Sequence, residues 1–474
     1  MRAYERGLHV VPKKEYGTVA VDVAGLDRLA GSELRGWYRQ LEQTGGCARP
    51  VYLVGHTMTR DRATGAVVHY FTSHSQPFGR LMIACRNRRD AVCPACALLH
   101  KGDTYQIVVS GLAGGKGVDP EVSRHPRVFA TLTAPSFGLV HGAGRAVCRA
   151  GKGQPTCPHG RALYCLATHQ PGDDQVGTPL CPDCYDYAGA VLFNAYAGQL
   201  WNRFCIQVRR DVATAAGIAR TKLGTVLRVS FVKVVEYQRR GAVHLHAVIR
   251  FDGPDGPGDQ PPDWATAELL AQAARGAGPA VSLRIPDPDG GIRVLRFGAQ
   301  LDVREIVAGD SAGLSARAVG SYVAKYVTKG DIPGLVHAWR FEMASQIRAA
   351  PYLTDHGKRL VLTAWNLGGR PEYEALRLRN WAQQLGFRGH IATKSRVYST
   401  TYGALRAARA DFRRQAAGLL LPHPDTTETQ SNWHYVESGL TPAQAEIAAS
   451  MAAQTAIRRG PKPDWIDDQP RDEP

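Results

Sequence analysis

The stretch "LRVSFVKVVEYQRRGAVHLHAVIRF", residues 227–251, decides the expected fold. Its two apolar segments are rich in β-branched residues and are separated by "RRG", which predicts two antiparallel strands joined by a short turn. Side chains alternate across a strand, so His244 and His246 share one face while Leu245 points to the other. In such a hairpin, Glu236 can lie across from both histidines.

Two imidazoles and one carboxylate that converge on one point form a metal site with open coordination positions. Such a site suits Mg²⁺ or Mn²⁺ carrying a phosphate oxygen. The spacing alone also fits a plainer interpretation, in which His244 and His246 are two ordinary, partly buried histidines of an edge strand.

A second informative stretch is "SYVAKYVTKG", residues 321–330, at the end of a helix predicted from about Ser315 to Gly330. Tyr322 and Tyr326 are four residues apart and share one helical face, with Lys325 and Lys329 on the adjoining face. A tyrosine hydroxyl with a pKa near ~10 is a poor nucleophile, but nearby ammonium groups and a metal-polarised phosphate make its attack feasible. The alternative is an amphipathic helix with its tyrosines toward the core and its lysines in solvent.

Composition indicates a soluble protein with a polyanionic partner. The chain has 474 residues, no run of eighteen apolar residues and no signal-peptide core at its N-terminus, so we expect a cytoplasmic protein without a membrane span. Its net charge of +16 favours nucleic acid, because Lys and Arg release counterions when they neutralise phosphates. A merely arginine-rich surface is the alternative.

Eight of the ten cysteines lie between Cys85 and Cys184, and in a cytosolic chain such clusters are more often metal ligands than disulfides. "CPAC" and "CPDC" each present two thiolates to Zn²⁺, and the two pairs together can complete one closed, structural four-thiolate site. A second zinc is compatible with the remaining cysteines, with a pairing that the sequence leaves open. The predicted structural zinc ligands are Cys85, Cys93, Cys96, Cys148, Cys157, Cys165, Cys181 and Cys184, with His100, His159 and His169 nearby. Cys47 and Cys205 are expected to stand apart as plain core or surface residues.

Basic residues in two places predict DNA contacts. The predicted DNA-binding residues are Arg239 and Arg240 in the turn, and Lys394, Arg396 and Arg406 in the C-terminal segment 394–414. Tyr398 and Tyr402 are interleaved with the latter, as in single-strand binding surfaces, and are alternative nucleophiles. A solvated basic helix is the other interpretation of this segment.

Three ordered motifs together resemble those of HUH endonucleases: "FATLTAP" (129–135), "VHLHAVI" (243–249) and "YVAKYVTK" (322–329). More narrowly they resemble rolling-circle replication initiators, and "CRNRRDAVCPAC" (85–96) and "CPDCYDYAG" (181–189) look like the initiators of actinobacterial plasmids and integrative elements. The resemblance covers roughly residues 80–415, and Arg86 departs from it by standing where a glycine is expected.

The resemblance implies an α+β fold with an HUH-type central antiparallel sheet flanked by helices, an inserted cysteine-rich zinc module and a mainly helical C-terminal region. The corresponding segments are an N-terminal mixed α/β segment (1–84), a zinc-binding region with the first motif (85–184), a nuclease core (185–335), a helical basic DNA-binding region (336–430), and a C-terminal helix with a disordered tail (431–474).

It also implies the chemistry. His244, His246 and Glu236 would bind the metal, Tyr326 would be the primary nucleophile and Tyr322 the second tyrosine. Lys325 and Lys329 would steady the phosphate, and Thr131 and Thr133 would have a structural or DNA-contacting role. Tyrosine would attack one origin strand, leaving a 5′-phosphotyrosine and a free 3′-hydroxyl.

The implied partners are origin DNA, as duplex or hairpin and as single strand, together with a host helicase and polymerase. The chain has no G-x-x-x-x-G-K-[ST] loop and thus no evident helicase of its own. The sequence leaves open whether the protein is a monomer or a dimer. Other functions compatible with the motifs are a relaxase, an HUH transposase and a non-catalytic, zinc-containing DNA-binding regulator.

Overall fold

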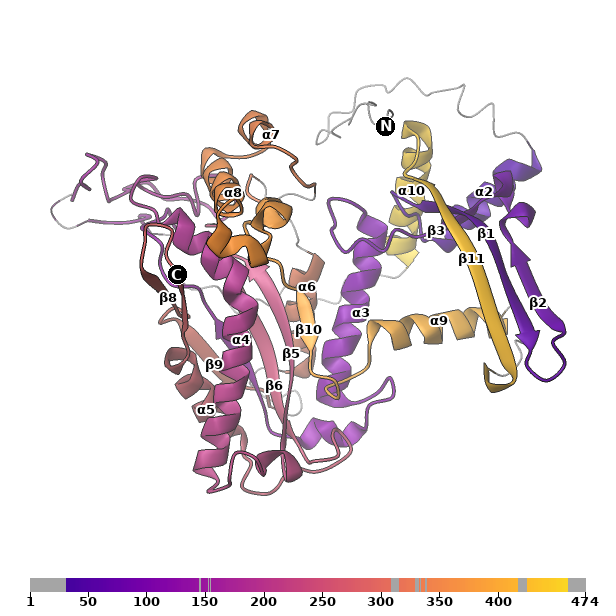
Figure 1. The fold of residues 1–474 in the computed structure, drawn as a ribbon, viewed down its shortest axis with the longest axis horizontal. Helices are drawn as coiled ribbons and strands as arrows, with labels where there is room; N and C mark the ends of the chain where they lie inside the picture. Colours follow the sequence, from indigo (N-terminus) through magenta and orange to yellow (C-terminus); the bar gives the residue numbers. More distant parts are fainter. Residues whose placement is uncertain are drawn as a thin grey trace. The chain divides into compact units, whose positions relative to one another are not determined.

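The computed structural model describes residues 31–144, 146–151, 153, 155–307, 315–328, 332, 334–336, 339–416 and 424–458. These residues form two compact units (Figure 1). One unit combines residues up to Cys85 with the C-terminal residues from 424 to 458, and the other contains the middle of the chain from Arg86 onward. Helices and antiparallel sheets occur in both units, so the expected α+β class is confirmed.

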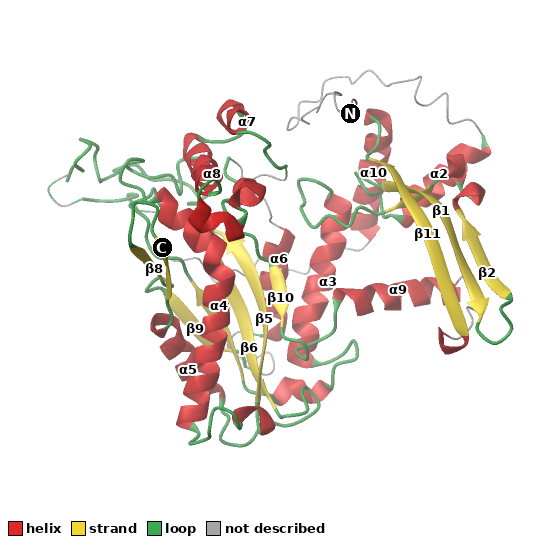
Figure 2. Ribbon diagram, in the orientation of Figure 1, coloured by secondary structure: helices red, strands yellow, loops and turns green. Residues whose placement is uncertain are grey.

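The middle unit is built on a five-stranded antiparallel sheet with the strand order β10-β5-β6-β4-β9 (Figure 2). The strands are β4 (Arg127–Leu132), β5 (Arg228–Tyr237), β6 (Val243–Asp252), β9 (Leu301–Glu305) and β10 (Ala392–Lys394). A separate two-stranded sheet pairs β7 (Leu283–Pro286) with β8 (Ile292–Leu295).

The hairpin of β5 and β6 follows the sequence pattern. Its register runs from Arg228 opposite Asp252 to Tyr237 opposite Val243. In the connecting turn, the Gln238 N–H donates to the Ala242 carbonyl over 2.8 Å, and Gly241 has a φ of +82°. That left-handed backbone favours glycine, which explains the glycine of "RRG".

Helices cover both faces of the sheet. The helices of this unit are α3 (Pro94–Ala113), α4 (Tyr187–Ala215), α5 (Ala267–Ala280), α6 (Ala316–Thr328), α7 (Ala344–Ala349), α8 (Asp355–Leu367) and α9 (Tyr402–Ala416). Trp201 of α4 packs against Phe231 on one face of β5, whereas Tyr322 of α6 packs against His246 on the opposite face of β6. Ser315 caps α6 by accepting a 3.2 Å hydrogen bond from the Ala318 N–H, so the predicted helix start is confirmed. Among the described residues, no helix has the length and apolarity to span a bilayer.

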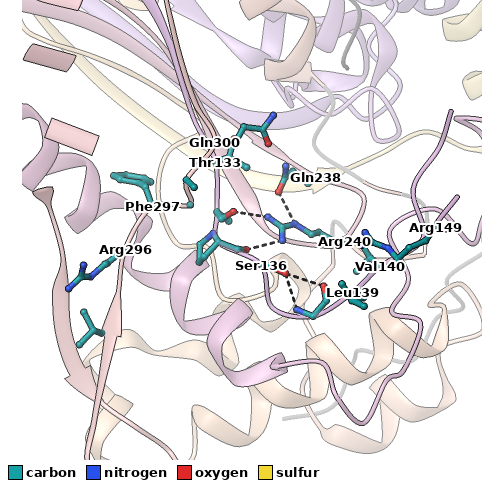
Figure 3. Close-up of a pocket in the computed structure, with 16 residues that line it drawn as sticks. Thr133, Ser136, Leu139, Val140, Arg149, Gln238, Arg240, Arg296, Phe297 and Gln300 are labelled. Atoms are coloured by element: carbon teal, nitrogen blue, oxygen red, sulfur yellow. Dashed lines mark hydrogen bonds between the residues drawn. The ribbon is translucent and has the colours of Figure 1, made fainter. Parts of the chain in front are cut away.

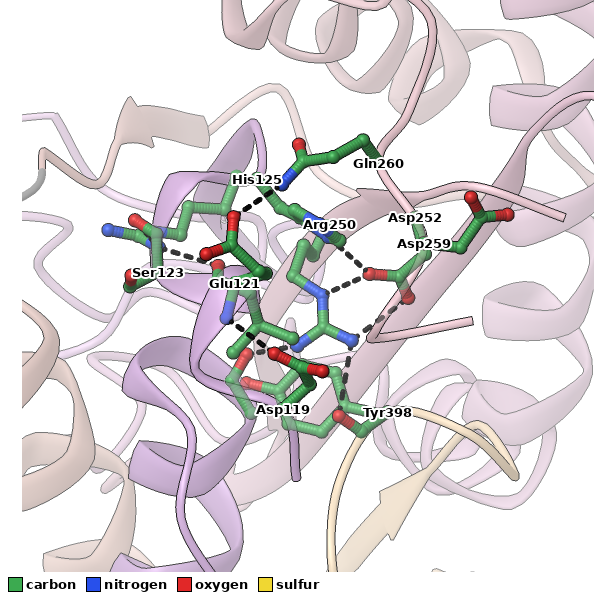
Figure 4. Close-up of polar contacts among 12 residues, drawn as sticks. Asp119, Glu121, Ser123, His125, Arg250, Asp252, Asp259, Gln260 and Tyr398 are labelled. Carbon is green, nitrogen blue, oxygen red and sulfur yellow. Dashed lines mark hydrogen bonds and ion pairs between the residues drawn. The ribbon is translucent and has the colours of Figure 1, made fainter. Parts of the chain in front are cut away.

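A buried ion-pair network fixes α3 to the α6-side face of the sheet (Figure 4). Arg250 is fully buried and forms a bidentate pair with Asp252, at 2.6 and 2.9 Å. Asp252 also accepts from His125 Nδ1 at 2.8 Å, and Arg250 donates to the carbonyls of Gly111 in α3 and of Tyr398. Because a buried charge is costly unless it is paired, removing one partner would leave the others uncompensated.

The other unit pairs strands from early and late in the sequence in one sheet with the order β11-β1-β2, and β3 also pairs with β1. Its elements are α2 (Ser32–Gln43), β1 (Val51–Asp61), β2 (Val67–Thr72), β3 (Leu81–Ile83), β11 (Thr427–Ser438) and α10 (Pro442–Arg458). Its fully buried core is small, formed by Trp37, Leu41, Met82 and Ala448.

The described C-terminal residues are mainly helical, as expected, but strand β11 was not predicted. Eleven register pairs tie it to β1, from Val51 opposite Ser438 to Asp61 opposite Thr427. Its side chains are mostly exposed, so it lacks the apolar alternation that marks a half-buried strand in a sequence. The tail expected to be disordered lies, from residue 459 onward, outside the described residues.

Candidate active site

The hairpin brings the predicted metal ligands together. Glu236 lies directly opposite His244 in the β5–β6 register, and His246 follows two residues later on the same face. Glu236 Oε2 is 2.9 Å from His244 Nε2 and 3.2 Å from His246 Nε2, and the two Nε2 atoms are 3.1 Å apart. Three donor atoms from two adjacent strands therefore form a nearly equilateral triangle.

This triangle fits a small divalent cation. An octahedral Mg²⁺ with ligands at about 2.1 Å has neighbouring ligand atoms about 3.0 Å apart, since they subtend a right angle. The measured edges of 2.9, 3.1 and 3.2 Å match one face of such an octahedron. Three protein ligands on one face would leave the opposite positions for water or substrate oxygens.

Neighbouring groups orient His246. Thr131 lies opposite His246 in the β4–β6 register, and its Oγ1 is 3.1 Å from His246 Nδ1. A partner on Nδ1 fixes the ring and directs Nε2 toward the metal position. Phe129 stacks on the His246 ring with 5.8 Å between centroids. Thr131 thus has a defined positioning contact, and Thr133 lies just beyond β4.

Glu236 is held as a carboxylate. Burial alone would raise its pKa, but hydrogen bonds and charge from His244 and His246 outweigh burial, so the pKa of Glu236 is lowered. The exposed side-chain fractions are 20% for Glu236, 16% for His244 and 2% for His246, so the site opens on the Glu236–His244 side.

Helix α6 lies against this triad. The Tyr322 ring meets His246 edge-on, with 5.0 Å between centroids, and also contacts Phe129 edge-on. Lys325 is half-buried in the same helix. Tyr326 belongs to α6, but its side chain lies outside the described residues, as does Lys329 entirely. The sequence-predicted tyrosine helix and histidine pair are therefore neighbours.

A cleft of about 710 Å³ opens at the same end of the sheet (Figure 3). Its lining includes Thr133, just after β4, and Gln238, just after β5. Arg149, Arg240 and Arg296 contribute positive charge, and none of the lining residues is acidic. Such a surface suits a phosphate backbone.

The guanidinium groups of Arg239 and Arg240 donate hydrogen bonds to acceptors within the protein. Arg239 donates to the carbonyls of Pro171, Asp173 and Val176. Arg240 donates to the carbonyls of Ala134 and Pro135 and to Gln238 Oε1. Both side chains thus organise the turn, and DNA contact by them stays a prediction.

The C-terminal basic segment is divided between buried and exposed groups. Arg396 and Arg406 are exposed, whereas Lys394 Nζ donates to the carbonyls of Ser395 and Arg396. Burial lowers the pKa of Lys394.

Both tyrosines of this segment hydrogen-bond to α3, and a role for either as an alternative nucleophile stays a prediction. Tyr398 precedes α9, is fully buried and donates to the Val108 carbonyl, and burial raises its pKa strongly. Tyr402 lies 2.7 Å from Thr104 Oγ1, with a pKa raised by burial. The two tyrosines do not share a helical face, because α9 begins only at Tyr402.

The cysteine-rich region contains two further ligand sets in the middle unit. The first set is His141, Cys148, Cys165 and His169, and the second is Cys157, His159, Cys181 and Cys184. In each set all four ligand atoms lie within 4.8 Å of one another. Thiolate and imidazole donors in fours are able to hold a metal such as zinc.

These sets correct the predicted pairing. Cys181 and Cys184 join Cys157 and His159 rather than Cys93 and Cys96. Cys93 and Cys96 are buried at the start of α3. In the other unit, Cys47 does not stand apart, because its Sγ accepts a 3.3 Å hydrogen bond from the Cys85 N–H.

One cysteine and two histidines remain to be described. Cys205 is half-buried in α4, outside the ligand sets of the described residues. His100 packs on Tyr402 instead of joining a set. His141 was missed by sequence reasoning, because no short, fixed spacing links it to a cysteine.

Comparison with known proteins places this chain, with its carboxylate–histidine triad and tyrosine-bearing helix, in a known family. Residues 33–453 match the family model described as "RepSA: Replication initiator protein, pSAM2". A "Replication initiator protein" of Streptomyces ambofaciens is 44% identical over 444 residues, covering 91% of this chain and 93% of that protein. The chain therefore belongs to this replication initiator family. No solved structure matches it significantly.

Proposed function

We propose that this replication initiator nicks one strand of its origin by HUH-type transesterification and thereby starts rolling-circle replication. The observation that carries the proposal is the triangle of Glu236, His244 and His246 with Tyr322 of α6 against it. A regulator that only binds DNA has no need of an open metal face beside a tyrosine-bearing helix.

In the proposed reaction, the phenol oxygen of Tyr326 attacks the phosphorus of one origin phosphodiester. A phosphotyrosine bond forms to the 5′ side, the bond to the 3′ oxygen breaks, and that oxygen takes a proton to become the 3′-hydroxyl end. The phenol proton passes to solvent. One ester replaces another, so the later reversal that rejoins the strand needs no ATP.

The roles of the other residues follow from their surroundings. Glu236, His244 and His246 would hold Mg²⁺ or Mn²⁺, which would polarise the scissile phosphate. Thr131 fixes the His246 ring. Lys325 and Lys329 would balance phosphate charge, and Tyr322, which lies against His246, would act as the second tyrosine or hold the ring in place.

The arginine-lined cleft beside the triad is proposed to receive the strand that leads to the scissile phosphate. Exposed Arg396 and Arg406 would contact origin DNA outside the cleft. A host helicase and polymerase would extend the free 3′ end.

The test is incubation of the protein with supercoiled origin plasmid and Mn²⁺. We expect an open-circular product with protein attached to the 5′ end, and loss of this adduct in Tyr326→Phe. Tyr70→Phe is a matched control, because Tyr70 is 56% exposed on β2 of the other unit. Origin binding without nicking would overturn the proposal in favour of a regulator.

Mapping the nick separates the remaining functions. Initiation of rolling-circle synthesis from the mapped 3′ end is expected for an initiator. Nicking at a transfer origin or at element ends alone would instead indicate a relaxase or a transposase.

A further inference from the structure

The two Cys/His ligand sets alternate along the chain. The ligands occur as His141 and Cys148 of the first set, Cys157 and His159 of the second, Cys165 and His169 of the first, then Cys181 and Cys184 of the second. Each set therefore closes around a segment that belongs to the other. Neither set can assemble without ordering most of residues 141–184.

Distances within both sets fit tetrahedral zinc. With thiolate sulfur at about 2.3 Å and imidazole nitrogen at about 2.1 Å, neighbouring ligand atoms lie about 3.5–3.8 Å apart. Cys165 Sγ is 3.4 Å from His169 Nε2, and Cys148 Sγ is 3.8 Å from His141 Nδ1. In the second set, His159 Nδ1 lies 4.0, 3.8 and 3.2 Å from the sulfurs of Cys157, Cys181 and Cys184.

Surrounding groups support the first set as a metal centre. His169 Nδ1 lies 2.7 Å from Asp173 Oδ2, which leaves Nε2 directed at the sulfur of Cys165. A carboxylate behind a ligating imidazole is the usual arrangement at zinc. The Gly142 N–H donates to Cys148 Sγ over 3.2 Å, as expected for a thiolate ligand.

The loop between His169 and Cys181 connects these ligands to the β5–β6 turn. On the ligand side, the Gly177 N–H donates to the His141 carbonyl over 2.8 Å, and the His141 N–H donates to the Thr178 carbonyl over 2.9 Å. Asp173 links the ligands to the turn, because its carboxylate hydrogen-bonds to His169 and its carbonyl accepts a hydrogen bond from Arg239 at 2.6 Å.

On the turn side, the loop backbone at Gly177 lies so close to Arg239 that one added methyl group would clash. Gly177 has a φ of +86°, and a Cβ there would lie 2.4 Å from the carbonyl carbon of Arg239. Arg239 also donates to the carbonyls of Pro171 and Val176, at 3.0 and 3.3 Å. Just after the last ligand, Tyr185 donates to the Arg240 carbonyl at 3.2 Å.

This turn determines how the triad is assembled. Glu236 lies two residues before Gln238, and His244 lies three residues after Gly241. A shift of the turn would move the carboxylate relative to both imidazoles, because β5 carries the carboxylate, β6 carries the imidazoles, and this turn joins the two strands.

We propose that residues 141–184 form an interleaved two-zinc module that clamps the β5–β6 turn and thereby holds Glu236 in register with His244 and His246. Both ions are structural, because four protein ligands complete each tetrahedron. Only the catalytic consequence of the clamp rests on the proposed function; the two metal sites and the clamp stand on their own.

Zinc content of the full-length protein tests the two sites. Relative to the parent protein, Cys165→Ser and Cys181→Ser are each expected to lose at least one equivalent of zinc, and the double variant two equivalents, by plasma mass spectrometry. Cys205→Ser is the control and should lose none, since Cys205 lies outside both sets. Loss of one equivalent or none in the double variant would overturn the two-site assignment.

Hydrogen exchange tests the clamp without altering a zinc ligand. In Gly177→Ala, zinc content should be unchanged, while the Gln238 amide, which donates to the Ala242 carbonyl, should exchange at least tenfold faster. Gly172→Ala is the matched control, because a Cβ at Gly172 meets nothing within 4 Å. Unchanged exchange at the turn in Gly177→Ala would refute the clamp.

A second pair of variants covers the case in which Gly177→Ala fails to fold. Arg239→Gln removes the three carbonyl contacts, and Arg210→Gln changes the same charge at an exposed position of α4. Faster exchange at the turn in the first variant alone is expected, and equal exchange in both would contradict the clamp. These measurements do not involve DNA cleavage, so they distinguish a failed clamp from a failed nickase assignment.

Discussion

The carboxylate–histidine triad and the two Cys/His sets position their candidate ligands in opposite ways. Glu236, His244 and His246 are carried by two long, paired strands with a core behind them. The eight candidate ligands between His141 and Cys184 lie in a segment whose described residues form only isolated β-bridges, such as Arg149 with Cys165. Three ligands on a preformed scaffold leave coordination positions open, whereas four ligands on irregular chain use all positions to hold the chain.

This difference predicts what each proposed metal would contribute. A strand pair is stabilised by its own ladder and core, so an ion at the triad would be free to serve the substrate. An irregular segment buries little apolar surface, so metal binding there contributes directly to folding free energy. Removal of one metal should impair chemistry, and removal of the other should impair structure.

The largest effect that distinguishes the triad from the Cys/His sets is expected for His246→Ala. With one of three ligands gone, we expect Mn²⁺ binding to become undetectable by calorimetry and the nicking rate to fall by roughly a thousandfold or more. Zinc content and thermal unfolding should stay near those of the parent protein. Retained nicking would mean that the triad is not the catalytic metal site.

Zinc removal should give the converse result. We expect a zinc chelator to destabilise the middle unit by several kcal/mol, because binding to structural zinc is coupled to folding. Calorimetry should then record a lower unfolding temperature that zinc restores and magnesium does not. An unchanged unfolding temperature after verified zinc loss would contradict a structural role.

A smaller effect is expected at His356, which supports the same turn from α8. Its Nε2 donates to the Arg240 carbonyl and its Nδ1 lies 3.1 Å from the Tyr187 hydroxyl, so the folded state requires the neutral ring. Burial lowers its pKa to about 4. Stability from the neutral ring is complete above the unfolded pKa of about 6.5 and is lost as pH falls from there toward 4, by about 3 kcal/mol at most.

Urea unfolding at pH 7 and pH 5 checks this dependence. His356→Gln keeps an N–H donor but does not titrate, so its stability should fall less between the two pH values. An equal fall in both proteins would exclude His356 as the source.

The smallest expected effect is at Thr131→Val, which keeps a β-branched side chain but removes the hydroxyl beside His246 Nδ1. Loss of a group that orients a metal-bound histidine typically costs ten- to a hundredfold in affinity. We therefore expect Mn²⁺ affinity to fall by about tenfold, measured by calorimetry, with unchanged zinc content. Thr393→Val, on β10 of the same sheet, should leave Mn²⁺ affinity as it is; if it does not, the effect is not specific to the histidine.

Several features were predictable because they depend on local periodicity. The two-residue repeat of a strand places His244 and His246 on one face, and the length of the turn places Glu236 opposite. The serine that caps helix α6 and the four-residue spacing of its tyrosines were likewise predictable from the sequence. The grouping of cysteines and histidines into two sets was not predictable, because a thiolate can be contributed from any distance along an irregular segment. His141 and Asp173 have no local sequence signature.

The sequence by itself therefore determined the class of fold, the meeting of Glu236 with the histidine pair, and the tyrosine helix, since regular backbone geometry converts residue spacing into spatial position. Only the tertiary structure decided that β11 completes the sheet of the N-terminal segment, that Tyr398 is buried under the Arg250–Asp252 pair, and that Cys181 joins Cys157. These contacts join residues far apart in the chain, and their free energy depends on burial and on partners that no local pattern specifies.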